Sequence, residues 1–335
     1  MKLQNLKSAA FAAAILCLVT PAHANWVRRV TDGIMGTRIT VELWADDEQK
    51  AERAIDAVLA EMRHVDDSMS TYKPSSEVSQ VNARAAQGPM RISKELFDLL
   101  TAAKEYSEIT DGAFDITYAS VGYMYDFRKH VHPDEAQIGH ALPAVDFRHV
   151  LLDAKNQTVK FSQAGVRIDL GGIAKGYSVD RGIEALKSLG FTRAYVSAGG
   201  DSRIIGDRFG KPWMVGIRDP RKGEGSVITS IPLVDAAIST SGDYERYFEE
   251  DGVRYHHIID PHTGHSASKV RSATIIGPNA TRTDGLSKTA FVLGPEKAME
   301  IYNRIDDIDA IIVTLDGKVI YSKGIEPARA RAPSK

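Results

Sequence analysis

The chain has 335 residues, of which 42 are lysine or arginine and 44 are aspartate or glutamate, so its formal net charge at pH 7 is −2. Because basic and acidic residues nearly balance, a strongly basic surface is not expected, and nucleic acid is therefore not an expected partner. With 43% hydrophobic residues, the chain is long enough for a substantial core that needs no disulfide.

The first residues predict a secretory signal peptide at 1–24. A basic start precedes an apolar run at 9–19, and residues 22–24 have the small-x-small pattern of a cleavage site. The apolar run is too short to span a membrane, and the only cysteine, Cys17, lies inside it. We expect a periplasmic protein that is soluble after cleavage near Ala24, is not membrane-embedded and has no disulfide.

The next segments predict a strand followed by helices. Residues 36–44 alternate apolar and polar side chains, which is typical of a half-buried strand. Two aspartates at 46–47 then cap a helix whose apolar stripe runs from Ile55 to Met69. A second helix is expected over about 93–109, beginning with a serine cap.

The C-terminal half is richer in strands, with one more helix over about 280–291. Strands are expected at 194–197, 213–217, 227–233, 255–259, 271–277, 310–315 and 319–321. Runs of strands with helices between some of them indicate an α+β fold with mixed, largely antiparallel sheets flanked by helices. We expect one domain at 25–325, with two closely packed subdomains as the alternative, and a flexible tail at 326–335.

Two glycines at 171–172 form the most informative local pattern. An apolar strand expected at 166–170 leads into them, and a helix that stops at Gly190 follows, so free backbone N–H groups would face a phosphate. Lys175 adds a cation and Asp169 a carboxylate. The pattern is neither a Walker loop nor a dinucleotide fingerprint. It predicts a nucleotide-binding loop, and a tight turn with a surface lysine is the alternative.

Four histidines, at 256, 257, 262 and 265, suggest a zinc site as one hypothesis. Consecutive side chains on a strand point to opposite faces, so His256 and His257 would not easily share one metal ion. A single histidine that faces a site is the favoured interpretation. A Ser-His-Asp hydrolase is a further hypothesis, but the chain has no Gly-x-Ser-x-Gly motif.

Glycine-rich and polar motifs follow one another in a fixed order along the chain. They are Met-Gly-Thr at 35–37, Met-Ser-Thr-Tyr-Lys-Pro-Ser-Ser-Glu at 69–77, Gly-Ala-Phe-Asp at 112–115, Asp-Leu-Gly-Gly-Ile-Ala-Lys-Gly at 169–176, Gly-Gly-Asp at 199–201, Ile-Arg-Asp-Pro at 217–220, Ser-Thr-Ser-Gly-Asp-Tyr at 239–244, His-Ile-Ile-Asp-Pro-His-Thr-Gly at 257–264 and Asp-Gly-Leu-Ser at 284–287. In this order they resemble the motifs of the ApbE-like FAD:protein FMN transferases. The resemblance extends from about Met35 to about Leu293.

The resemblance implies an ApbE-like fold and magnesium-dependent transfer of FMN from FAD to a Thr or Ser hydroxyl of a target redox protein, through a phosphoester bond and with release of AMP. Residues that match cofactor-binding positions are Met35, Tyr72, Ala113, Phe114, Asp115, Asp169, Lys175, His257 and Asp260. The expected catalytic residues are Lys175, Asp284 and His257, the last as a general base with an ordinary pKa of about 6.5.

The resemblance also implies magnesium ligands at the Gly172 carbonyl and the Asp284 carboxylate. Relatives often carry threonine four residues after this aspartate, where this chain has Lys288. An ammonium cannot ligate magnesium. The third ligand is therefore the main-chain oxygen of Lys288, or neighbouring Ser287 or Thr289, or the amine partly replaces the cation.

Two other functions use the same site. A hydrolase would split FAD into FMN and AMP with water in place of the acceptor hydroxyl. A flavin-binding protein without turnover would retain FAD, and the presence of Asp169, Lys175 and Asp284 together argues against it. One departure from the family pattern, Tyr-Ala-Ser at 118–120, leaves the local chain path open.

Overall fold

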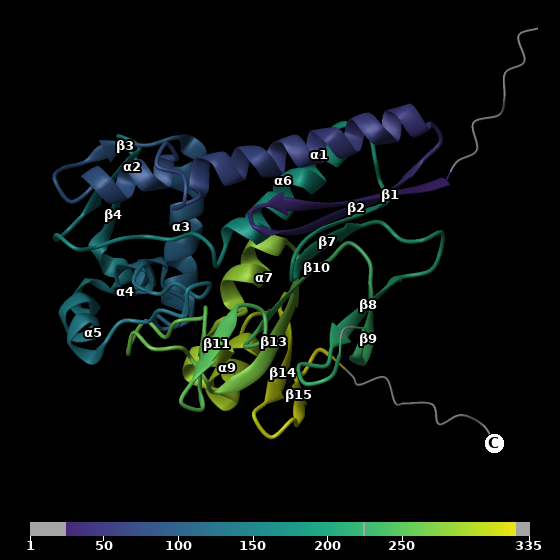
Figure 1. Cartoon of the computed structure of the whole chain (residues 1–335). Helices are drawn as coiled ribbons and strands as arrows, with labels where there is room; N and C mark the ends of the chain where they lie inside the picture. Colours follow the sequence, from purple (N-terminus) through teal and green to yellow (C-terminus); the bar gives the residue numbers. More distant parts are fainter. Residues whose placement is uncertain (1–24, 224, 326–335) are drawn as a thin grey trace, which may run out of the picture.

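An eight-stranded antiparallel sheet runs through the molecule and carries helices on one of its faces (Figure 1). The computed structural model describes residues 25–223 and 225–325, so the expected signal peptide at 1–24 and tail at 326–335 lie outside the described residues. In spatial order the strands are β1 (Asn25–Ile34), β2 (Thr37–Ala45), β6 (Ala194–Ala198), β7 (Asp201–Ile205), β10 (Ala237–Gly242), β13 (Val270–Gly277), β14 (Asp309–Thr314) and β15 (Val319–Tyr321). The helices on that face are α1 (Glu48–Met69), α6 (Ala174–Ser188), α7 (Ala280–Leu286), α8 (Thr289–Leu293) and α9 (Pro295–Tyr302).

The two faces of the sheet bury different cores. Ile205 of β7 packs with side chains of α1 and α6, whereas its neighbour Ile204 packs under the hairpin of β8 (Trp213–Arg218) and β9 (Val227–Leu233). This division follows from the strand repeat, because successive side chains point to opposite faces. The sheet is therefore covered on both sides.

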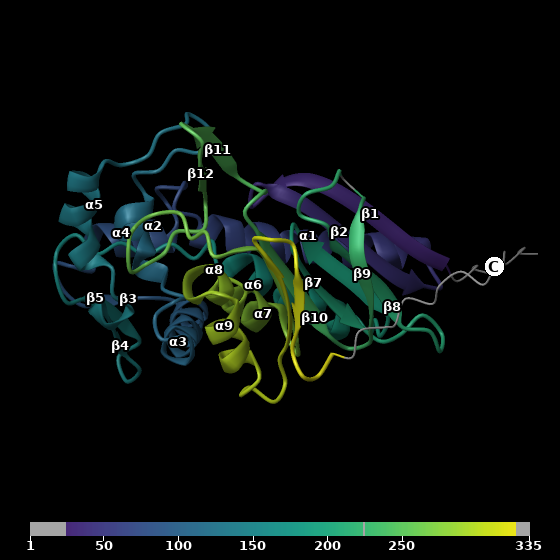
Figure 2. The ribbon, with the colours of Figure 1, turned by 90° about the horizontal axis from the view of Figure 1, so that it is seen from below.

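A second group of elements lies to one side of the sheet, beyond the C-terminal end of α1 (Figures 1 and 2). It contains α2 (Glu77–Arg84), α3 (Lys94–Ile109), α4 (Ala119–Gly122), α5 (Glu135–Ala141), the 3₁₀ helices Ile116–Tyr118, Leu142–Ala144 and Phe147–His149, and the small sheet of β3 (Met90–Arg91), β5 (Thr158–Phe161) and β4 (Val150–Asp153). Ile173 and Ala174 belong to the core of this group, whereas Val179 and Ile183 belong to the core of the large sheet. The start of α6 thus lies where the two groups meet.

Local signals in the sequence locate several elements correctly. Asp47 caps α1 by accepting from Lys50 N at 2.9 Å, and Ser93 caps α3 by accepting from Leu96 N at 3.1 Å. The expected strand at 36–44 is β2. The predicted α+β fold with largely antiparallel sheets is confirmed, because every strand pairing in the described residues is antiparallel.

Residues 166–170 do not form the predicted strand. The amide of Asn82 takes the place of a neighbouring strand, because its Nδ2 donates to Ile168 O at 2.8 Å and its Oδ1 accepts from Ile168 N at 2.7 Å. Asp169 N donates to Ile116 O at 3.0 Å. The segment is extended and well bonded, but its partners are a side chain and the first residue of a 3₁₀ helix.

The helix predicted over 280–291 is interrupted between α7 and α8. The carbonyl of Asp284 accepts from Ser287 N at 3.2 Å, three residues on, and also from Ser287 Oγ at 2.8 Å and Lys288 Nζ at 2.7 Å. Side chains that bond a helical carbonyl compete with the backbone for it. This interruption places Lys288 beside the start of α6.

The strand predicted at 255–259 is β12 (Val253–His256), which pairs with β11 (Tyr247–Glu250) in a separate hairpin. Beside its end, Ser266 Oγ accepts from His256 N at 2.9 Å and donates to His256 O at 2.7 Å, and His257 N donates to Arg246 O at 3.1 Å. Several elements were not expected from the sequence, namely β1, β3, β4, β5, β7, β10, β11, α2, α4, α5 and α9. No helix of the described ranges, 25–223 and 225–325, combines the length and apolar character needed to cross a membrane.

Candidate active site

Two lysines and two aspartates from distant parts of the chain meet at the start of α6. Lys175 Nζ lies 3.3 Å from Asp201 Oδ2 and 3.7 Å from Asp284 Oδ2. Lys288 Nζ bonds the other oxygen of Asp284, Oδ1. The two aspartates are buried, with 5% and 1% of their side-chain surfaces exposed. The structure thus brings the predicted residues Lys175 and Asp284 together and adds Asp201.

The N-terminus of α6 turns backbone donors toward these side chains. Ile173 occupies the cap position and makes no side-chain hydrogen bond to the helix. Gly176 N donates to Asp284 Oδ2 at 3.0 Å, so this carboxylate lies at the positive end of the helix. A helix start of this kind, with Lys175 beside it, favours an anion such as a phosphate.

Oxygens from two segments surround the ammonium of Lys288. Nζ donates to Gly172 O at 2.9 Å, to Asp284 O at 2.7 Å and to Asp284 Oδ1. We call these three oxygens the oxygen cradle. Of the two alternative magnesium ligands, Ser287 already bonds Asp284 O and Ser241 Oγ through its hydroxyl, and Thr289 is fully buried in α8.

Asp169 holds the loop before α6 in place. Its Oδ1 accepts from Gly171 N at 2.6 Å and from Tyr118 OH at 3.2 Å, and its Oδ2 accepts from Thr71 Oγ1 at 2.7 Å. An ionised carboxylate has about four acceptor positions, so one or more remain for a ligand. Tyr118 lies in the segment whose path the sequence left open.

The charges at the start of α6 shift one another's pKa values. Burial tends to raise the pKa of Asp284, but Lys175 and Lys288 outweigh it and hold this pKa below its usual value. Burial, and then the neighbouring Asp284, raise the pKa of Asp201. Burial tends to lower the pKa of Lys175, which Asp201 and Asp284 nevertheless raise above its usual value. Burial lowers the pKa of Lys288, against the opposing effect of Asp284.

His257 lies within electrostatic reach of the same cations. Burial, the neighbouring His256 and then Lys175, Arg246 and Lys288 lower its pKa to about 3. Its Nδ1 is buried and has no hydrogen-bond partner among the described residues. The ordinary pKa of about 6.5 expected from the sequence therefore does not hold in the free protein, because burial and the nearby positive groups lower the pKa of this half-buried imidazole.

The expected flavin-binding residues differ in how accessible they are. Tyr72 has 90% of its surface exposed, so its ring is open to stacking on a ligand. Met35 is half-buried and packs against two cores, the core of the second group of elements and the core between the large sheet and its helices α1 and α6. Ala113 and Phe114 are buried.

Two expected flavin-binding acids bond the protein itself. The two carboxylate oxygens of Asp115 accept from Thr117 and from Phe147 N. Asp260 Oδ1 accepts from His262 N at 2.9 Å and lies 3.0 Å from His262 Nδ1. Over residues 25–223 and 225–325, no three His, Cys, Asp or Glu side chains gather as a metal site. The histidines of the zinc hypothesis therefore do not converge.

Two residues of this region, Asp201 and Arg246, were not expected from the sequence as site residues. Asp201 follows the glycine turn at 199–200, and its place at the end of a Gly-Gly-Asp motif was a usable signal. Arg246 donates to Gly36 O at 3.2 Å and lowers the pKa of His257, although it lies outside all of the family motifs given above. No local pattern in the sequence indicates Arg246.

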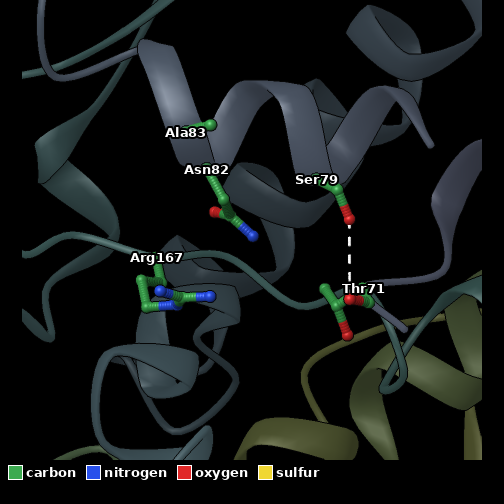
Figure 3. Close-up of a pocket in the computed structure, with 5 residues that line it drawn as sticks. All are labelled: Thr71, Ser79, Asn82, Ala83 and Arg167. Carbon is green, nitrogen blue, oxygen red and sulfur yellow. Dashed lines mark hydrogen bonds between the residues drawn. The ribbon is translucent and has the colours of Figure 1, made fainter. Parts of the chain in front are cut away.

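A small polar hollow of about 150 Å³ lies beside the extended segment before the glycines (Figure 3). Its lining residues are Thr71, Ser79, Asn82, Ala83 and Arg167. Drug-sized ligands usually occupy roughly 300–1,000 Å³, so FAD is too large for this space. Because Asn82 bonds the backbone of Ile168, the hollow belongs to the scaffold of the loop.

Acid should weaken the fold through the buried His256. Burial lowers the pKa of His256 to about 4, so the unfolded chain binds its proton more readily than the folded one. The stabilisation is complete above pH 6.5 and is lost as the pH falls toward 4. Urea unfolding at several pH values should show this decline, and it should be shallower in His256→Leu but unchanged in the exposed control His140→Gln. Equal slopes in all three proteins would contradict the assignment.

Known proteins resemble this chain over most of its length. The model of the ApbE family matches residues 35–312. A protein from Klebsiella pneumoniae (strain 342) named FAD:protein FMN transferase is 32% identical over 301 residues, which are 89% of this chain and 92% of that protein. The crystal structure of the ApbE protein from Thermotoga maritima has a TM-score of 0.81 at 36% identity and covers 90% of this chain and 98% of that chain.

A further solved structure agrees with these likenesses. The flavinyl transferase ApbE from Pseudomonas stutzeri has a TM-score of 0.78 at 29% identity, covering 90% of this chain and 95% of that one. The family model covers well over half of the chain, and several of the motifs that carry the resemblance, among them those at 169–176, 199–201 and 284–287, meet at the start of α6. The chain therefore belongs to the ApbE family.

Proposed function

We propose that this protein is an FAD:protein FMN transferase, which moves the FMN half of FAD to a Thr or Ser hydroxyl of a target protein and releases AMP. One observation carries the proposal. In a chain of the ApbE family, Lys175, Asp201 and Asp284 meet at the start of α6, where backbone donors favour a diphosphate.

The reaction is an in-line displacement at the FMN-side phosphorus. The acceptor oxygen forms a new phosphoester bond, the bond from this phosphorus to the bridging oxygen breaks, and AMP leaves with that oxygen. Lys175 stabilises the negative charge that develops on the departing phosphate. The acceptor hydroxyl loses its proton to a general base.

His257 is the proposed base. Its imidazole is neutral at pH 7, so it can accept a proton. Burial is the main cause of its lowered pKa, and the entering diphosphate opposes only the further effect of the nearby cations. Asp169, Met35 and the exposed ring of Tyr72 are proposed to hold the flavin end of FAD. Ala113, Phe114, Asp115 and Asp260 support that site from buried positions.

Magnesium, which the family resemblance implies, would use Gly172 O and the carboxylate of Asp284. Both groups bond Lys288 Nζ, so the oxygens that remain do not fit a divalent ion at this point. We therefore derive no step through a metal ion.

The proposed cellular setting follows from the N-terminal sequence. Residues 1–24 direct the chain to the periplasm and are removed, residues 25–325 form the catalytic domain, and 326–335 are a tail. The proposed targets are redox proteins that expose an acceptor Thr or Ser to the periplasm.

Mass spectrometry of co-expressed periplasmic redox proteins tests the function. We expect an FMN-sized mass increment on a Thr or Ser that appears only with the active protein, together with AMP. Release of AMP that does not depend on an acceptor would instead identify an FAD pyrophosphatase. FAD bound stoichiometrically, with no AMP under any condition, would identify a flavin-binding protein.

Removing the base should slow transfer without loss of FAD binding. We expect His257→Ala to transfer FMN about 10²- to 10⁴-fold more slowly than the unmodified protein. Rates come from the mass increment over time, and FAD binding from the quenching of flavin fluorescence. The exposed His140 provides the matched control His140→Ala. A wild-type rate in a His257→Ala protein that binds FAD normally would remove His257 from the mechanism.

A further inference from the structure

Lys288 occupies the centre of a site that resembles a cation site. The three oxygens of the cradle come from Gly172 and Asp284, residues separated by more than 100 positions in the sequence. Asp284 is 1% exposed and the Lys288 side chain 16% exposed. Carbonyl and carboxylate oxygens of this kind are ligands that hard cations prefer.

The number of acceptors matches an ammonium ion. Protonated lysine has three N–H donors and no acceptor, and each of the three cradle oxygens takes one donor. A neutral amine would turn its lone pair toward one of these oxygens. The contacts therefore describe a positive charge held at a fixed point.

Phe114 and Lys288 pack closely around Gly172. A Cβ at Gly172 would lie 3.3 Å from the Phe114 ring, which is a tight contact, and 3.6 Å from Lys288 Cε, which is ordinary van der Waals contact. The interruption between α7 and α8 directs Lys288 to the start of α6. The cation thus lies where Lys175 and the helix N-terminus already favour a diphosphate.

A divalent ion and this ammonium exclude each other. Mg²⁺ requires oxygens at about 2.0–2.1 Å in near-octahedral geometry, and the oxygens of the cradle are bonded to Nζ. The positive charges of Mg²⁺ and of the Lys288 ammonium would also repel each other strongly in a buried site. A bound magnesium ion would have to displace the lysine.

We propose that the Lys288 ammonium is a built-in cation that takes the place of the divalent metal, so that this protein cleaves FAD without one. The inference rests on the proposed function. The acceptor oxygen forms the new phosphoester bond, and the bond from the FMN-side phosphorus to the bridging oxygen breaks, as proposed above. Lys288 supplies a fixed positive charge beside the diphosphate while AMP departs.

Metal dependence and metal binding together test this inference. The proteins are the full mature chain, Lys288→Thr and the control Lys94→Thr, in which an exposed lysine pairs with Asp98 at the same spacing of four residues. One measurement is AMP release from FAD and acceptor protein, with EDTA or with Mg²⁺. The other is Mn²⁺ binding by electron paramagnetic resonance without FAD.

We expect the unmodified protein and Lys94→Thr to be equally active in EDTA and in Mg²⁺ and to bind no Mn²⁺ at this site. Lys288→Thr should lose at least about 100-fold activity in EDTA, because the fixed positive charge beside the diphosphate is removed. It should recover activity with Mg²⁺ and bind one Mn²⁺.

Loss of wild-type activity in EDTA, or stoichiometric Mn²⁺ binding by the wild type, would overturn the inference even if Lys288→Thr failed to fold. Absence of AMP and of FMN transfer in every protein and condition would instead reject the proposed function. Mn²⁺ binding would still decide whether Lys288 fills a metal site.

Discussion

Replacement of Asp284 by asparagine is expected to abolish FMN transfer and to destabilise the fold. The change keeps the size of the side chain but removes the buried charge that balances Lys175 and Lys288. Loss of one partner from a buried ion pair costs about 3–5 kcal/mol, because the other charge remains buried. Activity should fall by at least about 100-fold, since the charges that bind the diphosphate lose their arrangement.

Urea unfolding and the transfer assay measure the two effects separately. Asp98→Asn is the matched control, because Asp98 pairs with Lys94 at the same spacing but is exposed, and its loss should cost under about 1 kcal/mol. The double variant Asp284→Asn/Lys288→Met removes both charges and should recover part of the lost stability. Equal stability of Asp284→Asn and the wild type would show that this carboxylate does not hold the cations.

Gly176→Ala should disrupt the contact between α6 and α7. A Cβ at this position would lie 2.1 Å from Ala280 O and 2.8 Å from Asp284 Cβ, and the carbonyl belongs to the backbone and cannot rotate away. The helices must separate, which breaks the bond from Gly176 N to Asp284 Oδ2. We expect a loss of about 3 kcal/mol or more in the free energy of unfolding, together with loss of FAD binding.

Helix propensity alone predicts the opposite sign. Alanine in place of glycine inside a helix stabilises by roughly 0.5–1 kcal/mol. Gly139→Ala is the matched control, because Gly139 lies in α5 and a Cβ added there would have no atom within 4 Å. Urea unfolding should show Gly139→Ala slightly more stable and Gly176→Ala much less stable. A stabilised Gly176→Ala protein would mean that α6 and α7 are not in close contact.

Local chemistry explains which parts of the fold were predictable. Asp47 and Ser93 cap their helices within three residues of the groups they bond, so the sequence alone locates the helix starts. The start of α6 is also predictable, because the two glycines at 171–172 and Lys175 lie in one short segment. The strand predicted at 166–170 failed, because an extended segment becomes a strand only if another strand lies beside it.

The candidate site likewise contains residues that the sequence indicates and residues whose roles depend on the fold. The residue types of Lys175 and Asp284 are visible in the sequence motifs, and the structure brings their side chains together. Asp201 and Arg246 were not expected from the sequence, because their roles depend on long-range contacts: Asp201 of β7 pairs with Lys175 of α6, and Arg246 acts on the pKa of His257. The low pKa of His257 was not predictable either, since it arises from burial and from cations elsewhere in the chain.

By itself, the sequence determined the family, the helix starts, the glycine loop and the presence of a lysine where relatives carry threonine. Those features depend on residues that are close together in the chain. Only the tertiary structure decided that Lys288 lies among oxygens of Gly172 and Asp284. That contact depends on how α6 and α7 pack on the sheet, and the free energy of such packing is spread over many distant side chains, so no local pattern encodes it.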